Sequence, residues 1–178
     1  MDEGMKKIVD LVGRELKWVQ PHATTMSFEL RDGEDVAATL RFRSLFGSFA
    51  TAESADGAWT FKRIGFFQTR ATVRALNSET DLGVFKNNTW KDGGTLEMPD
   101  GRKYRADTNF WATKCSFKAE SGEVLIGFQK IGGILHMSST VQIHEAARSL
   151  PELPWMALLG WYLTVMMHYD RAAVAAAT

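Results

Sequence analysis

The stretch from Leu153 to Tyr169 contains no Asp, Glu, Lys or Arg, and most of its residues are apolar. Pro151 and Pro154 stand where it begins, which suits the start of a helix because a missing backbone N–H costs nothing there. An amphipathic surface helix keeps one polar face, whereas a helix that is apolar all round is buried. This helix therefore needs an apolar enclosure, which either a bilayer or the rest of the chain must provide.

Two features of the segment favour enclosure by the protein. A helix that spans a bilayer needs about 20 consecutive apolar residues, and this segment is marginally short. Trp161 and Tyr162 stand in its middle, whereas spanning helices tend to place Trp and Tyr at both membrane interfaces. We expect a central helix over residues 154–169 and no transmembrane span.

The body of the chain, over residues 24–143, carries closely spaced turn signals that contain Gly. Asp-Gly is the favoured pair for two-residue β-hairpins, because the type I′ turn needs positive φ at both central residues. Each signal therefore predicts a hairpin. The signals are Arg31-Asp32-Gly33-Glu34, Ala55-Asp56-Gly57, Lys91-Asp92-Gly93-Gly94, Pro99-Asp100-Gly101 and Glu120-Ser121-Gly122.

Between these turns, apolar residues alternate with polar ones, so one face of each strand is expected to be buried and the other exposed. We count about eleven strands, and that many short antiparallel strands imply a barrel or a sandwich, because an open sheet would leave costly edges. The predicted inward positions are Met26, Phe28, Leu30, Val36, Ala38, Leu40, Phe42, Trp59, Phe61, Ala71, Val73, Trp111, Cys115, Phe117, Val124, Ile126, Phe128, Val141 and Ile143.

A chain of 178 residues suits one domain, here residues 1–178. Within the N-terminal segment, residues 1–20, a short helix over Lys6 to Leu16 is one interpretation, and a first strand ending at Val19 is another for its last part. The single cysteine, Cys115, cannot form an internal disulfide, and the N-terminus lacks the pattern of a signal peptide. We expect a cytoplasmic protein.

Charge and motifs exclude several classes of function. Lys plus Arg equals Asp plus Glu at 21 each, so no global field favours nucleic acid. Phosphate-binding loops, dinucleotide fingerprints, zinc-protease motifs and nucleophile elbows are missing from the sequence. We expect no enzymatic activity, no cofactor and no metal.

The histidines and the cysteine fit structural roles. His136 and His144 share a strand face by parity, but eight residues of strand would hold them about 27 Å apart, too far to bind one metal ion. His168 lies in the apolar helix, where we expect a buried neutral imidazole with a backbone partner. Cys115 is expected to be a small core residue rather than a reactive thiol.

The order of elements resembles that of the tubby-like C-terminal superfamily, which includes tubby proteins, LURP-one-related proteins and phospholipid scramblases. Three stretches carry this resemblance, which covers about residues 16–170: Ala55-Asp56-Gly57-Ala58-Trp59-Thr60-Phe61-Lys62-Arg63, Asp100-Gly101-Arg102-Lys103-Tyr104 and Leu153-Pro154-Trp155. The chain looks like a bacterial-type member. The resemblance implies a mainly β fold: a closed antiparallel barrel of about 11–12 strands around the C-terminal helix.

Tubby domains bind membrane phosphoinositides through basic residues, so the resemblance directs attention to the basic side chains of this chain. Arg41 and Arg43 share one predicted outward face, Arg70 and Arg74 share another, and Lys62 lies between them in sequence. A meander of these strands would gather them into one patch able to hold a phosphate. Calcium, which is linked to scramblases, is not expected here because no calcium-binding loop is found.

Three functions stay open. The first is a non-enzymatic module that binds a lipid headgroup, another anion or a protein at its surface, and that lies at the membrane periphery if the partner is a phospholipid. The second is a barrel that carries a small apolar ligand. The third is an enzyme whose site is built from loops.

Overall fold

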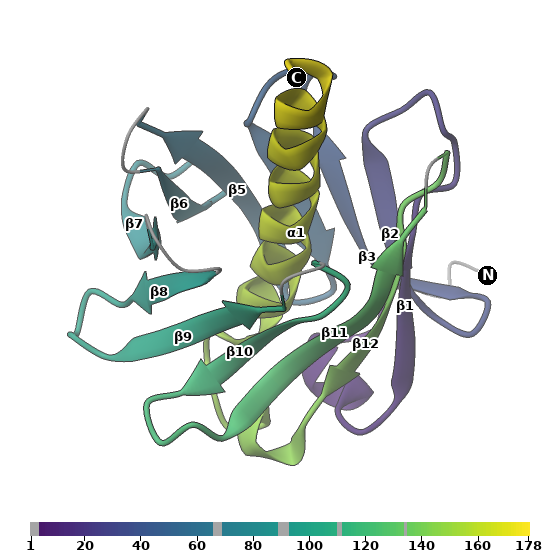
Figure 1. The fold of residues 1–178 in the computed structure, drawn as a ribbon. Helices are drawn as coiled ribbons and strands as arrows, with labels where there is room; N and C mark the ends of the chain where they lie inside the picture. Colours follow the sequence, from purple (N-terminus) through teal and green to yellow (C-terminus); the bar gives the residue numbers. More distant parts are fainter. Residues whose placement is uncertain (1–3, 66–68, 89–92, 110–111, 134) are drawn as a thin grey trace.

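The computed structural model describes residues 4–178 except 66–68, 89–92, 110–111 and 134. Its twelve strands form one closed antiparallel barrel around a single long helix (Figure 1). The strands are β1 (Glu15–Val19), β2 (Ser27–Asp32), β3 (Asp35–Phe42), β4 (Ala50–Ser54), β5 (Gly57–Ile64), β6 (Arg70–Ala75), β7 (Asp81–Asn87), β8 (Gly93–Glu97), β9 (Lys103–Thr108), β10 (Cys115–Ala119), β11 (Val124–Gly132) and β12 (Ser138–Ile143).

The first and last strands close the barrel. Each strand pairs with its neighbour in the sequence, and β1 also pairs with β12, so that Trp18 lies opposite Leu30 on one side and Ser139 on the other. The expected fold class, a closed antiparallel barrel around a C-terminal helix, is confirmed. The strand region begins earlier than the expected residue 24, because β1 lies in the N-terminal segment.

The N-terminal segment contains both features that its sequence left open. The helix is shorter than Lys6 to Leu16: it is the 3-10 helix η1 (Ile8–Leu11), in which Ile8 and Leu11 are buried. β1 follows at once. A second 3-10 helix, η2 (Glu145–Ala147), connects β12 to the long helix.

The long helix, α1 (Leu153–Ala176), runs along the middle of the barrel (Figure 1). Trp161 stacks on Trp18 with ring centroids 5.8 Å apart, and Tyr162 stacks on Phe42 at 5.4 Å. α1 continues beyond the expected residue 169, but residues 169–178 are exposed outside the barrel. Within the described ranges, no helix combines the length and apolar character that crossing a bilayer requires.

The hairpins form where the turn signals predicted them, but the predicted turn type was wrong. Gly101 has φ +90° and Asp100 does not have positive φ, so this is not a type I′ turn. The Gly101 N–H donates to Met98 O at 3.0 Å, and the Met98 N–H donates to Arg102 O at 2.9 Å, as in a type I turn followed by a left-handed glycine. Residues 91–92 of the third signal lie outside the described residues.

Two β-bulges change which residues face the core. Ala37 is an extra residue between the pairs Leu30–Ala38 and Arg31–Val36, so Ala37 is buried and Val36 is only partly buried, contrary to expectation. Leu125 is the extra residue of the second bulge, and Val124 is again only partly buried. Trp111, also predicted to point inward, lies outside the described residues.

The two ends of the barrel differ. Odd-numbered strands run toward the end from which the last turns of α1 emerge (Figure 1), and we call this the exit end. Two contacts hold the helix there: the Tyr169 hydroxyl lies 2.7 Å from the sulfur of Met26, and Arg63 forms an ion pair with Asp170. α1 begins at the opposite end.

Candidate functional site

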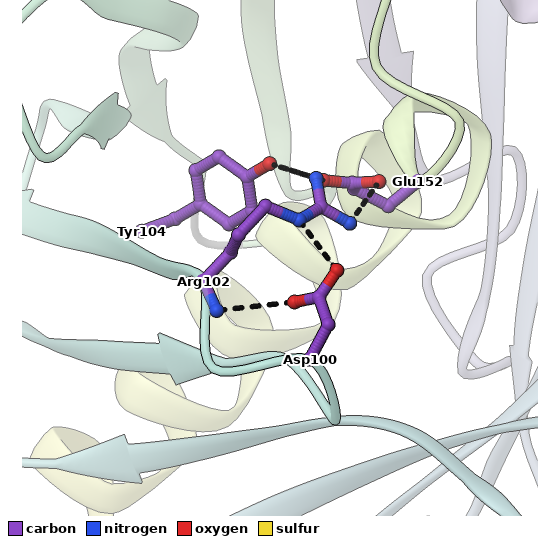
Figure 2. A network of polar contacts seen from close by, with 4 residues as sticks. All are labelled: Asp100, Arg102, Tyr104 and Glu152. Atoms are coloured by element: carbon purple, nitrogen blue, oxygen red, sulfur yellow. Dashed lines mark hydrogen bonds and ion pairs between the residues drawn. The ribbon is translucent and has the colours of Figure 1, made fainter.

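A polar network fastens the beginning of α1 (Figure 2). The Glu152 side chain is only 2% exposed, accepts a hydrogen bond from the Tyr104 hydroxyl, and pairs with Arg102 at 2.6 Å between Oε1 and Nη1. Arg102 also pairs with Asp100, at 2.7 Å between Nε and Oδ2. The network therefore joins the hairpin of β8 and β9 to the residue that precedes the helix.

The hydrogen bonds in this network stabilise the protonated forms of Tyr104 and Arg102. Burial, and next the hydrogen bond to Glu152, raise the pKa of Tyr104 to about 12, so its hydroxyl stays protonated and donates. Hydrogen bonds to Asp100 and then Glu152 raise the pKa of Arg102 above its ordinary value. Each donor has an acceptor in the set, which indicates a structural fastening.

Replacing Glu152 with Ala is expected to lower the free energy of unfolding by about 1–3 kcal/mol, because the Tyr104 hydroxyl would lose its acceptor in a buried site. Chemical denaturation measures the change. Glu145→Ala is the matched control, since it breaks an exposed pair with Arg148 and should lower the free energy of unfolding much less. Equal losses in the two variants would contradict the buried-network interpretation.

A cavity of about 500 Å³ opens at the exit end, between the second half of α1 and the strands β5 to β10. Cavities of roughly 300–1,000 Å³ are the size that small-molecule ligands occupy. We call it the mouth cavity. Its described lining residues share a position near the end of a strand or on one side of the helix: Arg63, Thr69, Arg70, Ala71, Phe85, Asn87, Asn88, Gly93, Ala106, Asp107, Thr108, Cys115, Leu163, Thr164, Met166, Met167, Asp170 and Arg171.

The apolar part of this lining comes from both the sheet and the helix. Leu163 and Met167 lie one turn apart on α1, and both are only partly buried, unlike their neighbours Val165 and Met166. Phe85 of β7 forms part of the opposite wall. Met side chains fill irregular space and adapt to different contacts. The cavity can therefore take up an apolar group.

The charged residues of the lining are unequally paired. Arg63 and Asp170 pair at 2.6 Å, and Asp107 pairs at 2.8 Å with Lys118, which lies outside the lining. Both acids are thus already engaged. Arg70 has no ion-pair partner among the residues that the structure describes, so its positive charge is uncompensated.

The thiol of the lining and the hydroxyl that α1 contributes to it are not activated. Burial raises the pKa of the Cys115 thiol to about 12, so it is protonated at neutral pH. Cys115 is partly buried and packs against the hydrophobic core. The Thr164 hydroxyl donates to Gly160 O at 2.8 Å. Neither group has a histidine beside it in the described lining.

His168 lies at the exit of the barrel. Burial, and next the charge of Arg171, lower its pKa, which favours the neutral imidazole that was predicted. A backbone hydrogen bond with Thr164 opposes part of this shift in the pKa. The buried Nδ1 atom makes no contact of full hydrogen-bond geometry among the described residues, so the Thr164 backbone is a weak partner.

The five basic residues predicted as an anion site occupy different surroundings. Arg41 belongs to a row across four strands, in which Thr51 and Thr60 separate it from Arg74. Arg74 pairs with Asp81 at 2.6 Å, and the Arg43 guanidinium lies 4.8 Å from the centre of the Phe49 ring. Lys62 lies opposite Thr72, and only Arg70 also lines the mouth cavity.

Sequence reasoning missed the cavity because it treated the helix as buried along its whole length. A helix that is apolar all round predicts burial of every residue in it, so the pattern does not distinguish Leu163 and Met167 from their buried neighbours. One signal was available: Asp170 and Arg171 are the first charged residues after the apolar stretch, so they mark where the helix leaves the barrel. Which strands end beside them depends on the register, which the sequence does not reveal.

Comparison with protein-family models finds no match for this chain, and comparison with curated proteins finds no significant match. Among solved structures, the X-ray structure of protein AT5G01750 from Arabidopsis thaliana, a LURP-one-related protein, is similar, with a TM-score of 0.53. The barrel has a tubby-like fold. The match covers 89% of this chain and 93% of that chain, but the identity is 11%, so the likeness concerns the fold alone.

Proposed function

We propose that this tubby-like barrel is a non-enzymatic binding protein that takes up a small apolar group in the mouth cavity. The observation that carries the proposal is the volume of about 500 Å³ beside Leu163, Met167 and Phe85. Apolar walls with a few polar groups at the rim are typical of ligand sites. This is the second of the functions that the sequence left open.

The surroundings of the outward basic residues favour the cavity over the outer face. Arg74 is neutralised by Asp81, and the Arg43 guanidinium lies over Phe49. A bound phosphate at this face would therefore compete with existing contacts. Within the mouth cavity, the protonated Cys115 thiol and the engaged Thr164 hydroxyl support binding rather than covalent chemistry.

The test uses decan-1-ol, a neutral amphiphile, with protein purified without detergent. Titration calorimetry is expected to show saturable binding with one site per chain, and native mass spectrometry should detect the same complex. Leu163→Trp should fill the cavity and weaken binding about tenfold or more, which corresponds to at least about 1.4 kcal/mol.

Val174→Trp is the matched control, because Val174 lies on the same helix but is 67% exposed and outside the lining. It adds the same bulky ring without filling the cavity, so its affinity should equal that of the original chain. No saturable binding, or equal loss in both variants, would overturn the proposal.

A further inference from the structure

The charged residues around Arg70 indicate which chemical class of ligand the mouth cavity accepts. Arg70 borders both this cavity and a shallow groove on the outside of β6 to β8. The four acids that line these two spaces each pair with another cation: Asp170 with Arg63, Asp107 with Lys118, Asp81 with Arg74, and Glu97 with Lys86. Arg70 therefore lies among carboxylates that are already engaged.

A second cation adds to the positive potential at this point. Lys86 lies directly opposite Arg70 in the pairing of β6 with β7. Like charges that face each other across two strands destabilise a sheet, and Glu97 neutralises only the Lys86 side of this pair, at 2.6 Å. A bound anion would relieve the repulsion that remains.

Neutral polar groups complete this side of the rim. Thr69 precedes Arg70, and its hydroxyl lies 3.4 Å from the Nδ2 of Asn87. Both residues line the cavity. A hydroxyl and an amide N–H can donate to carboxylate or phosphate oxygens, while the guanidinium offers a planar pair of donors that matches either group.

We infer that the ligand of the mouth cavity is an anionic amphiphile, with its apolar part against Leu163, Met167 and Phe85 and its carboxylate or phosphate on Arg70. This inference rests on the proposed function and adds the chemical class of the ligand. Arg70 then determines specificity, since it is a lining cation with no ion-pair partner among the described residues.

The experiment compares four probes that share a ten-carbon chain, at concentrations where each is dispersed as single molecules: decanoate, decyl phosphate, decan-1-ol and decyltrimethylammonium. The two anions are expected to bind about tenfold or more tightly than the alcohol, because hydrogen bonds between ionised groups are stronger than those to a neutral hydroxyl. Their advantage should shrink as salt screens the charge. The difference between decanoate and decyl phosphate then distinguishes a carboxylate ligand from a phosphate ligand.

Arg70→Gln is expected to remove the preference for the anions, so that decanoate and decyl phosphate bind no more tightly to this variant than decan-1-ol does. Arg41→Gln is the control, because Arg41 is also an exposed strand cation but does not line the cavity. Melting curves verify that both variants are folded, and the salt dependence of binding to the unsubstituted protein supplies a second test.

Equal affinity of the unsubstituted protein for decanoate and decan-1-ol would overturn this inference but would leave the proposed function intact. If no probe bound, the proposed function itself would fail.

Discussion

Removing residues Pro151 to Thr178 is expected to leave no folded barrel. Buried inward side chains of the strands, such as Phe28, Phe61 and Phe117, would lose the surface against which they pack. The deletion also removes Glu152, the acceptor of the Tyr104 hydroxyl. We expect the product to aggregate or to remain molten, with poorly dispersed amide resonances and no cooperative unfolding transition.

The size of this effect follows from what α1 buries. Burying a large apolar side chain contributes roughly 1.5–3 kcal/mol, whereas the net stability of a whole domain is only about 5–15 kcal/mol. The free energy lost when all the buried side chains of α1 are removed therefore exceeds the net stability of the whole domain. The large apolar helix residues that are at most 7% exposed are Leu153, Trp155, Met156, Leu158, Leu159, Trp161, Tyr162, Val165 and Met166.

A shorter deletion provides the control. Residues 172–178 are exposed and lie beyond the ion pair of Arg63 with Asp170, so removing them should change the free energy of unfolding little. If the larger deletion instead gave a monomeric product with dispersed resonances and cooperative unfolding, the helix would not be the core of the barrel. A helix that served as a membrane anchor would behave in that way.

The fold was predictable from the sequence because its two strongest patterns agree. The charge-free segment from Leu153 to Tyr169 requires burial, and the alternating segments between glycine turns provide inward apolar faces. The local departures could not be predicted. Ala37 and Leu125 are buried because bulges insert them, and the parity of a strand changes at such a point without any marker in the composition.

The candidate site was predictable only in part. Arg70 was selected as one of five basic residues, but its position beside the cavity follows from strand order and from where α1 leaves the barrel. The engagement of Arg74 by Asp81 and the place of Arg43 over Phe49 depend on contacts within one hairpin or loop. Outward parity identifies exposed cations, but it does not reveal which of them lacks a partner.

The absence of a side chain at Gly160 has a steric cause. A Cβ at this position would lie 2.4 Å from Cζ of Phe128 and 3.3 Å from Cε2 of Phe117. Both rings are fully buried, so they have little room to move.

Gly160→Leu is expected to lower the free energy of unfolding by about 1–3 kcal/mol through overpacking, and thermal or chemical denaturation measures the loss. Gly160→Ala gives a stricter test, because Ala in a helix interior is favoured over Gly by about 1 kcal/mol; destabilisation must therefore come from the ring of Phe128. Combining Gly160→Ala with Phe128→Leu should reduce the penalty of the added methyl group, and this coupling separates the clash from a general effect on the helix. An unchanged melting temperature in Gly160→Leu would show that space exists beside Gly160, and the central part of the barrel would then be available to a ligand as well as the mouth cavity.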